Sequence, residues 1–164
     1  MNRVGILTFH SANNFGALLQ AVSLQKTIME RGNVECELID YEPEFIRKDY
    51  SISPFKDNHP KAIIKSALRI PDKIKRNLKF QAFREENIVC SKQCLSENDF
   101  KNICNSLDEI VVGSDQVWNY NLTKYDMHYF LPEIDASVKK VAYAASTGGA
   151  DFSLKESNKM IQCL

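Results

Sequence analysis

Short apolar runs alternate along this chain with stretches in which apolar residues recur at helical spacing. The runs of strand length and strand composition are residues 4–9, 34–38, 109–112 and 138–145. Helical spacing is found in residues 17–29, 100–107 and 154–164. Strands that alternate with helices in this way pair in parallel through right-handed crossovers. We therefore expect an α/β fold over residues 1–164, a single domain with a Rossmann-like parallel sheet and flanking helices.

Residue types at the ends of the helical stretches indicate where the helices begin and end. Gly32 is expected to take the left-handed conformation that closes the first helix. Ser96 with Asp99, and Ser153 with Glu156, resemble capping boxes. No cap follows the last stretch, so we expect the chain to be the front part of a longer protein whose carboxyl-terminal domain is missing here, or a truncated gene product.

Polar loops follow three of the strands and are the main candidates for a site. They comprise residues 10–16, 113–119 and 146–149. Because parallel strands place their carboxyl ends on one edge of a sheet, these loops are expected to converge, and ligands of open α/β sheets bind at that edge. The first loop also opens a helix, whose free N–H groups would suit an anionic oxygen.

Several of these loop residues have an ordinary structural interpretation as well. Asn13 and Asn14 are typical turn and N-cap residues, and Asp115 is suited to cap a short helix beginning at Gln116. Trp118 is a natural packing anchor. His10 suits proton transfer at a strand end, but the sequence identifies no partner for it. Both interpretations stay open.

Composition excludes some classes of protein. Lys and Arg together number 21, as do Asp and Glu, so the formal net charge is zero and a nucleic-acid partner is not expected. The first residues enter a strand without a leader, and no apolar run has the length of a membrane span, which favours the cytoplasm. The five scattered cysteines fit small buried side chains in a reducing compartment, and no metal site is predicted.

A basic segment at about residues 54–92 interrupts the alternating pattern. Residues 56–92 contain ten Lys or Arg and four Asp or Glu, and apolar residues with Pro60 and Pro71 indicate two helices. The simplest interpretation is a solvated helical insertion packed beside the sheet. A surface for an anionic glycan, or peripheral association with an anionic membrane, is the alternative.

The three polar loops contain no Lys or Arg. Phosphate and carboxylate groups are usually held by such cations, and the first loop matches neither the dinucleotide fingerprint nor a P-loop. The cations for an anionic ligand are therefore expected from elsewhere.

Four segments of the chain form a recognisable set. They are Val4–Phe9, Asn14–Gln20 (Asn-Phe-Gly-Ala-Leu-Leu-Gln), Val112–Asn119 (Val-Gly-Ser-Asp-Gln-Val-Trp-Asn) and Ala142–Ser146. Together they resemble the polysaccharide pyruvyl transferase family. The second and third segments are the specific ones, and the resemblance extends over nearly the whole chain. It implies the amino-terminal half of a two-domain fold of the glycosyltransferase-B type.

The resemblance also implies a reaction, transfer of the pyruvyl group of phosphoenolpyruvate to two sugar hydroxyls as a ketal, in the synthesis of exopolysaccharides and other cell-surface glycans. The donor contacts would come largely from the second half, and the acceptor would be a sugar or polysaccharide precursor. No cofactor is expected besides the donor. The alternatives are a sugar-binding module without turnover and half of a nucleotide-sugar glycosyltransferase.

Candidate roles follow from this chemistry, which needs an acid, a base and groups that orient hydroxyls. Asp115 and His10 are the candidates for proton transfer. The candidates for substrate binding are Asn13, Asn14, Gly16, Gln20, Ser114, Gln116, Trp118 and Ser146. We expect the loop at residues 113–119 to form the acceptor-facing wall of an interdomain cleft.

Overall fold

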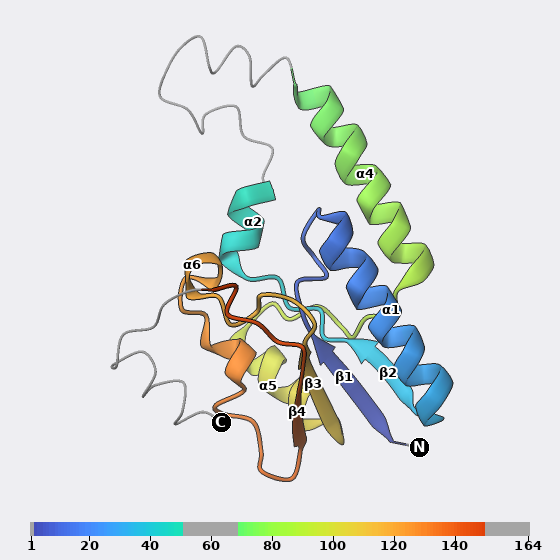
Figure 1. Ribbon diagram of the computed structural model, residues 1–164, viewed down its shortest axis with the longest axis vertical. Helices are drawn as coiled ribbons and strands as arrows, with labels where there is room; N and C mark the ends of the chain where they lie inside the picture. The colour runs from blue at the N-terminus through green and yellow to red at the C-terminus, as the bar shows by residue number, and fades with distance from the viewer. Residues whose placement is uncertain (1, 51–68, 150–164) are drawn as a thin grey trace.

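The computed structural model describes residues 2–50 and 69–149, which form a four-stranded sheet flanked by helices (Figure 1). The strands are β1 (Arg3–Leu7), β2 (Glu35–Leu38), β3 (Glu109–Gly113) and β4 (Lys139–Tyr143). They are ordered β2-β1-β3-β4, and all neighbours pair in parallel. The predicted α/β fold with a Rossmann-like parallel sheet is confirmed.

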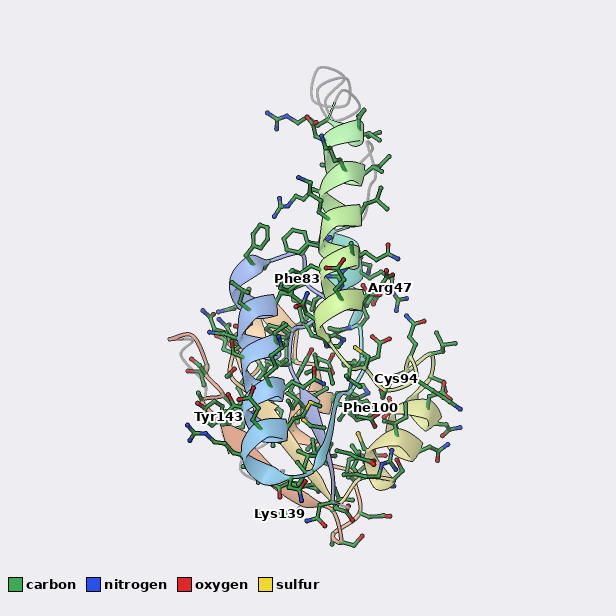
Figure 2. The ribbon with its side chains drawn as sticks, turned by 90° about the vertical axis from the view of Figure 1, so that its right-hand side faces the viewer. Arg47, Phe83, Cys94, Phe100, Lys139 and Tyr143 are labelled. Atoms are coloured by element: carbon green, nitrogen blue, oxygen red, sulfur yellow. The ribbon has the colours of Figure 1, made fainter. Side chains whose placement is uncertain are left out.

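Helices lie on both faces of this sheet. They are α1 (Phe15–Gly32), α2 (Glu44–Tyr50), α4 (Ile70–Asn87), α5 (Glu97–Asn105), the short α6 (Tyr120–Thr123) and the 3₁₀ helix η2 (Met127–Phe130). Figure 2 shows α1 and α5 on opposite sides of the strands. Alternate strand residues therefore enter two separate cores.

The two cores follow the alternation of β1 and β3. Ile6 and Val111 belong to the cluster that includes residues of α1, whereas Leu7, Ile110 and Val112 belong to the cluster that includes residues of α5. All five are buried, and burial of an aliphatic side chain contributes about 1.5–3 kcal/mol. The sheet is thereby anchored on both faces along its two central strands.

Two of the predicted helix ends, at Ser96 and Gly32, can be compared with the structure, whereas the predicted cap at Ser153 and Glu156 lies outside the described residues. Ser96 Oγ accepts a hydrogen bond from Asp99 N at 3.2 Å, so the predicted cap of α5 is confirmed. The left-handed residue after α1 is Asn33, with φ 47°, and Gly32 is the last helical residue. Asn adopts this conformation more readily than other non-glycine residues, so the helix continues one residue further than expected.

The predicted helix beginning at Gln116 was wrong. Asp115 Oδ1 accepts a hydrogen bond from Gln116 N at 2.7 Å, but a turn follows. The next helix, α6, begins at Tyr120, and Asn119 caps it by accepting from Asn121 N at 3.1 Å. An Asx side chain bonds its neighbouring amides in turns as well as at helix starts, so residue type did not distinguish the two.

The described part of the basic segment is a single long helix, α4, with Pro71 in its first turn. Phe80 is its one buried side chain, and it packs on Phe15 at the start of α1 with ring centroids 4.5 Å apart. Thus α4 packs against the beginning of α1 more than beside the sheet. The other predicted helix of the segment and the stretch 154–164 lie outside the described residues.

Candidate functional site

The second and third polar loops are joined by backbone hydrogen bonds. Ser114 N donates to Tyr143 O at 3.0 Å, Ser146 N donates to Asp115 O at 3.0 Å, and Trp118 N donates to Ser146 O at 3.1 Å. These bonds continue the pairing of β3 with β4 beyond the strands. The two loops therefore converge at one edge of the sheet, as expected.

Two glycines allow this close approach. Gly113 has φ +119°, and a Cβ atom there would collide with Tyr143 O. Gly148 has φ +62°, and a Cβ atom there would meet the side-chain amides of Gln116 and Asn119. At Gly113 only glycine accommodates both the backbone conformation and the proximity of the Tyr143 carbonyl, whereas at Gly148 a side chain would displace the flexible ends of Gln116 and Asn119.

A groove of about 850 Å³ lies between α1 and β4. Five of the predicted site residues line it: Gln20, Ser114, Asp115, Gln116 and Ser146. The volume is in the range of known small-ligand sites. The structure thus brings half of the sequence-predicted candidates to one cavity.

The five predicted site residues are called the polar end of the groove below. The rest of the lining includes an apolar floor. Leu24 and Ile28 of α1 face Val111 and Val141 of the sheet, and Arg31 lies in the last turn of α1. Among the described residues that line the groove, Arg31 alone is Lys or Arg. The groove therefore combines uncharged hydrogen-bonding groups and one carboxylate with an apolar floor, a surface suited to a polyhydroxylated ligand more than to a polyanion.

Among the residues that the structure describes, β4 is the edge strand of the sheet beside this groove. In Figure 2, Lys139 and Tyr143 mark the two ends of β4 at the outer side of the sheet. Both side chains are exposed, and only Val141 of this strand is partly buried. The groove is thus accessible from the β4 side.

The polar side chains at the groove are partly organised by one another. Asn119 Nδ2 donates to Gln116 Oε1 at 2.9 Å, and Ser146 Oγ accepts from Gly148 N at 2.9 Å. The Gln116 amide nitrogen and the Ser146 hydroxyl proton keep their donor capacity for a ligand. Asp115, partly exposed, has a carboxylate that accepts from one amide and retains further acceptor sites.

The expected convergence of the first loop with the other two was wrong, because this loop lies against α4 and none of residues 10–16 lines the groove. Arg84 Nη1 donates to Asn13 Oδ1 at 3.1 Å and Ser11 O at 3.4 Å, and Arg76 Nη2 donates to Asn13 O at 3.0 Å. Asn13 Nδ2 in turn donates to Asn77 Oδ1 at 2.8 Å. Asn13 is buried and fully engaged by α4, so its role in this structure is to hold the loop.

The amides at the start of α1 are also occupied. Asn14 Oδ1 accepts from Gly16 N at 2.8 Å and from Ala17 N at 3.4 Å, which confirms Asn14 as the N-cap. The proposed anion site at these amides is therefore taken by a side chain. Cations do lie nearby, on α4 and not on the loops, and burial lowers the pKa of the Arg84 guanidinium.

His10 is almost completely buried, with 2% of its surface exposed. Its Nδ1 lies 3.3 Å from Thr8 O, and its Nε2 lies 3.3 Å from Asp40 Oδ1. Asp40 follows β2, the neighbour of β1, so pairing of the strands supplies the partner that sequence did not identify. His10 does not line the groove, and a catalytic role for it stays a prediction.

Trp118 is a packing residue in this structure. Its Nε1 donates to Tyr129 O at 3.1 Å, and its ring stacks on Phe130 with centroids 5.6 Å apart. Gly16, Asn14 and Trp118 are absent from the described groove lining. Substrate contact by these three residues stays a prediction.

A polar cluster that the sequence did not indicate lies on the α5 side. His128 Nδ1 is 2.6 Å from Asp126 Oδ1, and His128 Nε2 is 2.8 Å from Glu97 Oε2. Tyr41 donates its hydroxyl proton to Asp126 Oδ2 at 2.7 Å. Because both imidazole nitrogens face carboxylates, the geometry favours the doubly protonated ring.

The pKa directions in this cluster follow from that geometry. Burial by itself would lower the pKa of His128, but the Asp126 and Glu97 carboxylates outweigh it and raise the pKa above 6.5. Burial would raise the pKa of Asp126, but hydrogen bonds from His128 and Tyr41 lower it below 3.8. The cluster ties the strand-end residue Tyr41 to α5 and η2 and is at its most favourable when His128 is charged.

The described cysteines form no disulfide, and Cys36 and Cys104 are buried as expected. Burial raises the pKa of the Cys36 thiol to about 11 and that of Cys104 to about 12. In residues 2–50 and 69–149, no group of three or more His, Cys, Asp or Glu residues is arranged to hold a metal ion. Cys90 is exposed, unlike the buried cysteines that were expected, and Cys163 lies outside the described residues.

Comparison with known families identifies the chain. The family model of polysaccharide pyruvyl transferases matches residues 14–163. The chain belongs to this family. The match includes every groove residue among the candidates, whereas His10 and Asn13 precede it. Neither the curated proteins nor the solved structures gave a match for this polysaccharide pyruvyl transferase family member.

A helix that crosses a membrane must be both long and apolar. In residues 2–50 and 69–149, no helix is both long and apolar enough to cross a bilayer.

Proposed function

We propose that this chain binds the sugar acceptor in a pyruvyl transfer reaction, with the groove between α1 and β4 as the acceptor site. The observation that carries the proposal is the convergence of Gln20, Ser114, Asp115, Gln116 and Ser146 on that groove. Amide and hydroxyl groups both donate and accept hydrogen bonds, as sugar hydroxyls do. Family membership supplies the class of reaction.

In the proposed reaction, phosphoenolpyruvate supplies the pyruvyl group. A proton adds to its methylene carbon, one sugar hydroxyl oxygen bonds to the central carbon, and that hydroxyl loses its proton to a base. The second hydroxyl then bonds to the same carbon as the C–O bond to the phosphate breaks, and its proton passes to the departing phosphate. The phosphate therefore leaves with the oxygen that bridged it to the enol carbon. Asp115 is the candidate base, because it is the carboxylate at the polar end of the groove.

The donor requires cations that the polar end of the groove does not supply. Arg31 is separated from Gln20 by eleven residues of α1, about 16 Å along a helix. Arg76 and Arg84 are engaged with the first loop. We propose that the phosphate and carboxylate of the donor are held by a surface outside the residues described in this structure.

The test uses the whole chain with oligosaccharide acceptors and phosphoenolpyruvate. Calorimetric titration is expected to show acceptor binding in the millimolar to micromolar range and weak or no binding of phosphoenolpyruvate. Ser146→Ala and Gln20→Ala should each weaken acceptor binding about tenfold, which corresponds to about 1.4 kcal/mol for one lost hydrogen-bonding group. Unchanged affinity in both variants would place the acceptor elsewhere.

The role of Asp115 is tested by Asp115→Asn in a transferase preparation that shows turnover. Phosphate release and the ketal methyl signal in NMR spectra should fall at least 100-fold while acceptor affinity stays within a factor of about three. Normal transfer by this variant would remove Asp115 from proton transfer. Acceptor binding without any turnover would favour the alternative function, a sugar-binding module, to which the amide, hydroxyl and carboxylate groups at the polar end of the groove are equally suited.

A further inference from the structure

The amino-terminal half of α4 presents apolar side chains to solvent. Ile74 is 43% exposed and Leu78 is 60% exposed, and Ile70 continues the same row at a spacing of four residues. Figures 1 and 2 both show this half of the helix extending beyond α1 and the sheet. Ile70, Ile74 and Leu78 are called the apolar row below.

Ile74 and Leu78 lie outside the face by which α4 packs on the protein. That face carries Phe80 and Arg84, which contact α1 and the first loop. Ile70, which is partly buried, and Asn77, seven residues after it, lie at the border of the two faces. Residues two apart on a helix are separated by about 200°, so Leu78 points away from Phe80. The helix therefore has one face for the domain and a second face without a described apolar partner.

Lysines flank the apolar row on both sides. Lys73, Lys75 and Lys79 are all exposed, and none of them forms an ion pair with another residue in the described ranges. No acidic residue occurs between Lys73 and Arg84. The chain as a whole has no net charge, so this positive charge is a local concentration on α4.

We propose that the amino-terminal half of α4 binds the surface of an anionic lipid bilayer. A helix with an exposed apolar row flanked by lysines lies in the bilayer interface, with the apolar side chains below the headgroups and the ammonium groups at their level. A soluble polyanion would engage the lysines alone and leave Ile74 and Leu78 in water. The combination of exposed aliphatic and basic side chains therefore favours a lipid surface over an anionic glycan.

Such binding would place the chain beside membrane-attached glycan precursors, but it does not depend on the proposed function. The contacts of Arg76 and Arg84 with the first loop also fix α4 relative to the strand ends. A bilayer held by α4 would therefore have a set orientation with respect to the groove.

The test measures co-sedimentation of the chain with phosphatidylcholine vesicles, with and without one-quarter phosphatidylglycerol. Binding is expected on the anionic vesicles, much less on the neutral ones, with a decrease as salt rises from 0.05 to 0.5 M. Each lysine near an anionic surface strengthens binding about fivefold, so Lys73→Gln/Lys75→Gln/Lys79→Gln should weaken it about 100-fold. Equal binding to both kinds of vesicle would overturn the proposal.

Two further variants distinguish a bilayer from a generic polyanion site. Ile74→Ser/Leu78→Ser keeps every charge and should still weaken vesicle binding at least tenfold, whereas Leu95→Ser, at a side chain 80% exposed on another surface, should leave it unchanged. Removal of three charges elsewhere, by Lys26→Gln/Lys92→Gln/Lys139→Gln, should have less than a threefold effect. Full vesicle affinity in the Ile74/Leu78 variant, or tighter binding of polygalacturonate than of vesicles, would instead assign the lysines to an anionic glycan. Circular dichroism verifies that each variant is folded.

Discussion

The carboxyl edge of the sheet is divided into a covered half and an open half. The loops after β1 and β2 lie beneath other elements: α4 holds Asn13, and α5 with η2 holds Tyr41. The loops after β3 and β4 bind to each other and face the groove. Similar polar residues therefore hold the fold together on one half and are available to a ligand on the other, according to whether a helix covers them.

The largest expected effect on stability is in the open half, at a glycine whose backbone has a positive φ and little space around it. Gly113→Ala should reduce the free energy of unfolding by more than about 3 kcal/mol, because φ is +119° and the new Cβ collides with the Tyr143 carbonyl. Gly149→Ala is the matched control, since its φ is +75° with open space around it, and it should cost about 1–2 kcal/mol. Urea denaturation of both variants measures the two losses in the free energy of unfolding. Equal losses would show that the positive φ alone, and not the collision with Tyr143, destabilises the variants.

The next effect concerns the covered half. Asn13→Ala removes the hydrogen bonds of the buried Asn13 side chain with Arg84 and Asn77 and should cost about 2 kcal/mol in urea denaturation. Asn14→Ala removes only an exposed N-cap, at about 1 kcal/mol. A larger loss for Asn14 than for Asn13 would contradict the assignment of Asn13 as the residue that fixes the loop.

A smaller effect, dependent on pH, is expected at the Tyr41 end of the covered half. The raised pKa of His128 means that its charged form stabilises the fold fully below about pH 6.5, and this contribution is lost as pH rises through the folded-state pKa. Asp126, with a lowered pKa, contributes above about pH 3.8 and loses its effect at lower pH. Partial exposure of the His128 ring, 23%, lets solvent screen the interaction, so the loss stays below that of Asn13→Ala.

His128→Gln tests this expectation. Urea denaturation at pH 5.5 and 8.5 should show a difference in wild-type stability that is largely absent from the variant. The His128 ring should also titrate above pH 6.5 in NMR spectra. An unchanged pH dependence in the variant would locate the responsible group elsewhere.

The smallest effect on stability is expected where the open half faces the groove. Gln20→Ala should change the free energy of unfolding by less than about 0.5 kcal/mol, because the side chain is exposed and Ala is favourable in helices. It should nevertheless weaken acceptor binding about tenfold, whereas Lys26→Ala on the outer face of α1 should change neither quantity. If Gln20→Ala lowered the free energy of unfolding as much as Asn13→Ala, Gln20 would also hold the fold together. The contrast between a structural covered half and a ligand-facing open half would then be wrong.

Local residue patterns predicted the elements well and the partners of side chains poorly. The apolar runs located all four strands within about two residues, and Ser96 and Asn14 were recognisable caps. The interpretation of Asp115 as the cap of a helix at Gln116 was wrong, because an Asx residue before a turn and one before a helix have the same local preference; its catalytic role stays a prediction. Choosing between them required the path of the chain through Asn119, which depends on packing.

The sequence by itself determined the parallel α/β architecture, the convergence of the second and third loops, and membership of the family, because the alternation of strands with helices and the motif residues are local patterns. The strand order was not predicted. Only the tertiary structure decided which polar residues face the groove. It placed Arg84 on Asn13, Asp40 on His10 and two carboxylates on His128, across separations of 30 residues or more in most of these pairs. Contacts between residues so far apart arise from the packing of whole helices and strands, and no local pattern of residue types encodes them.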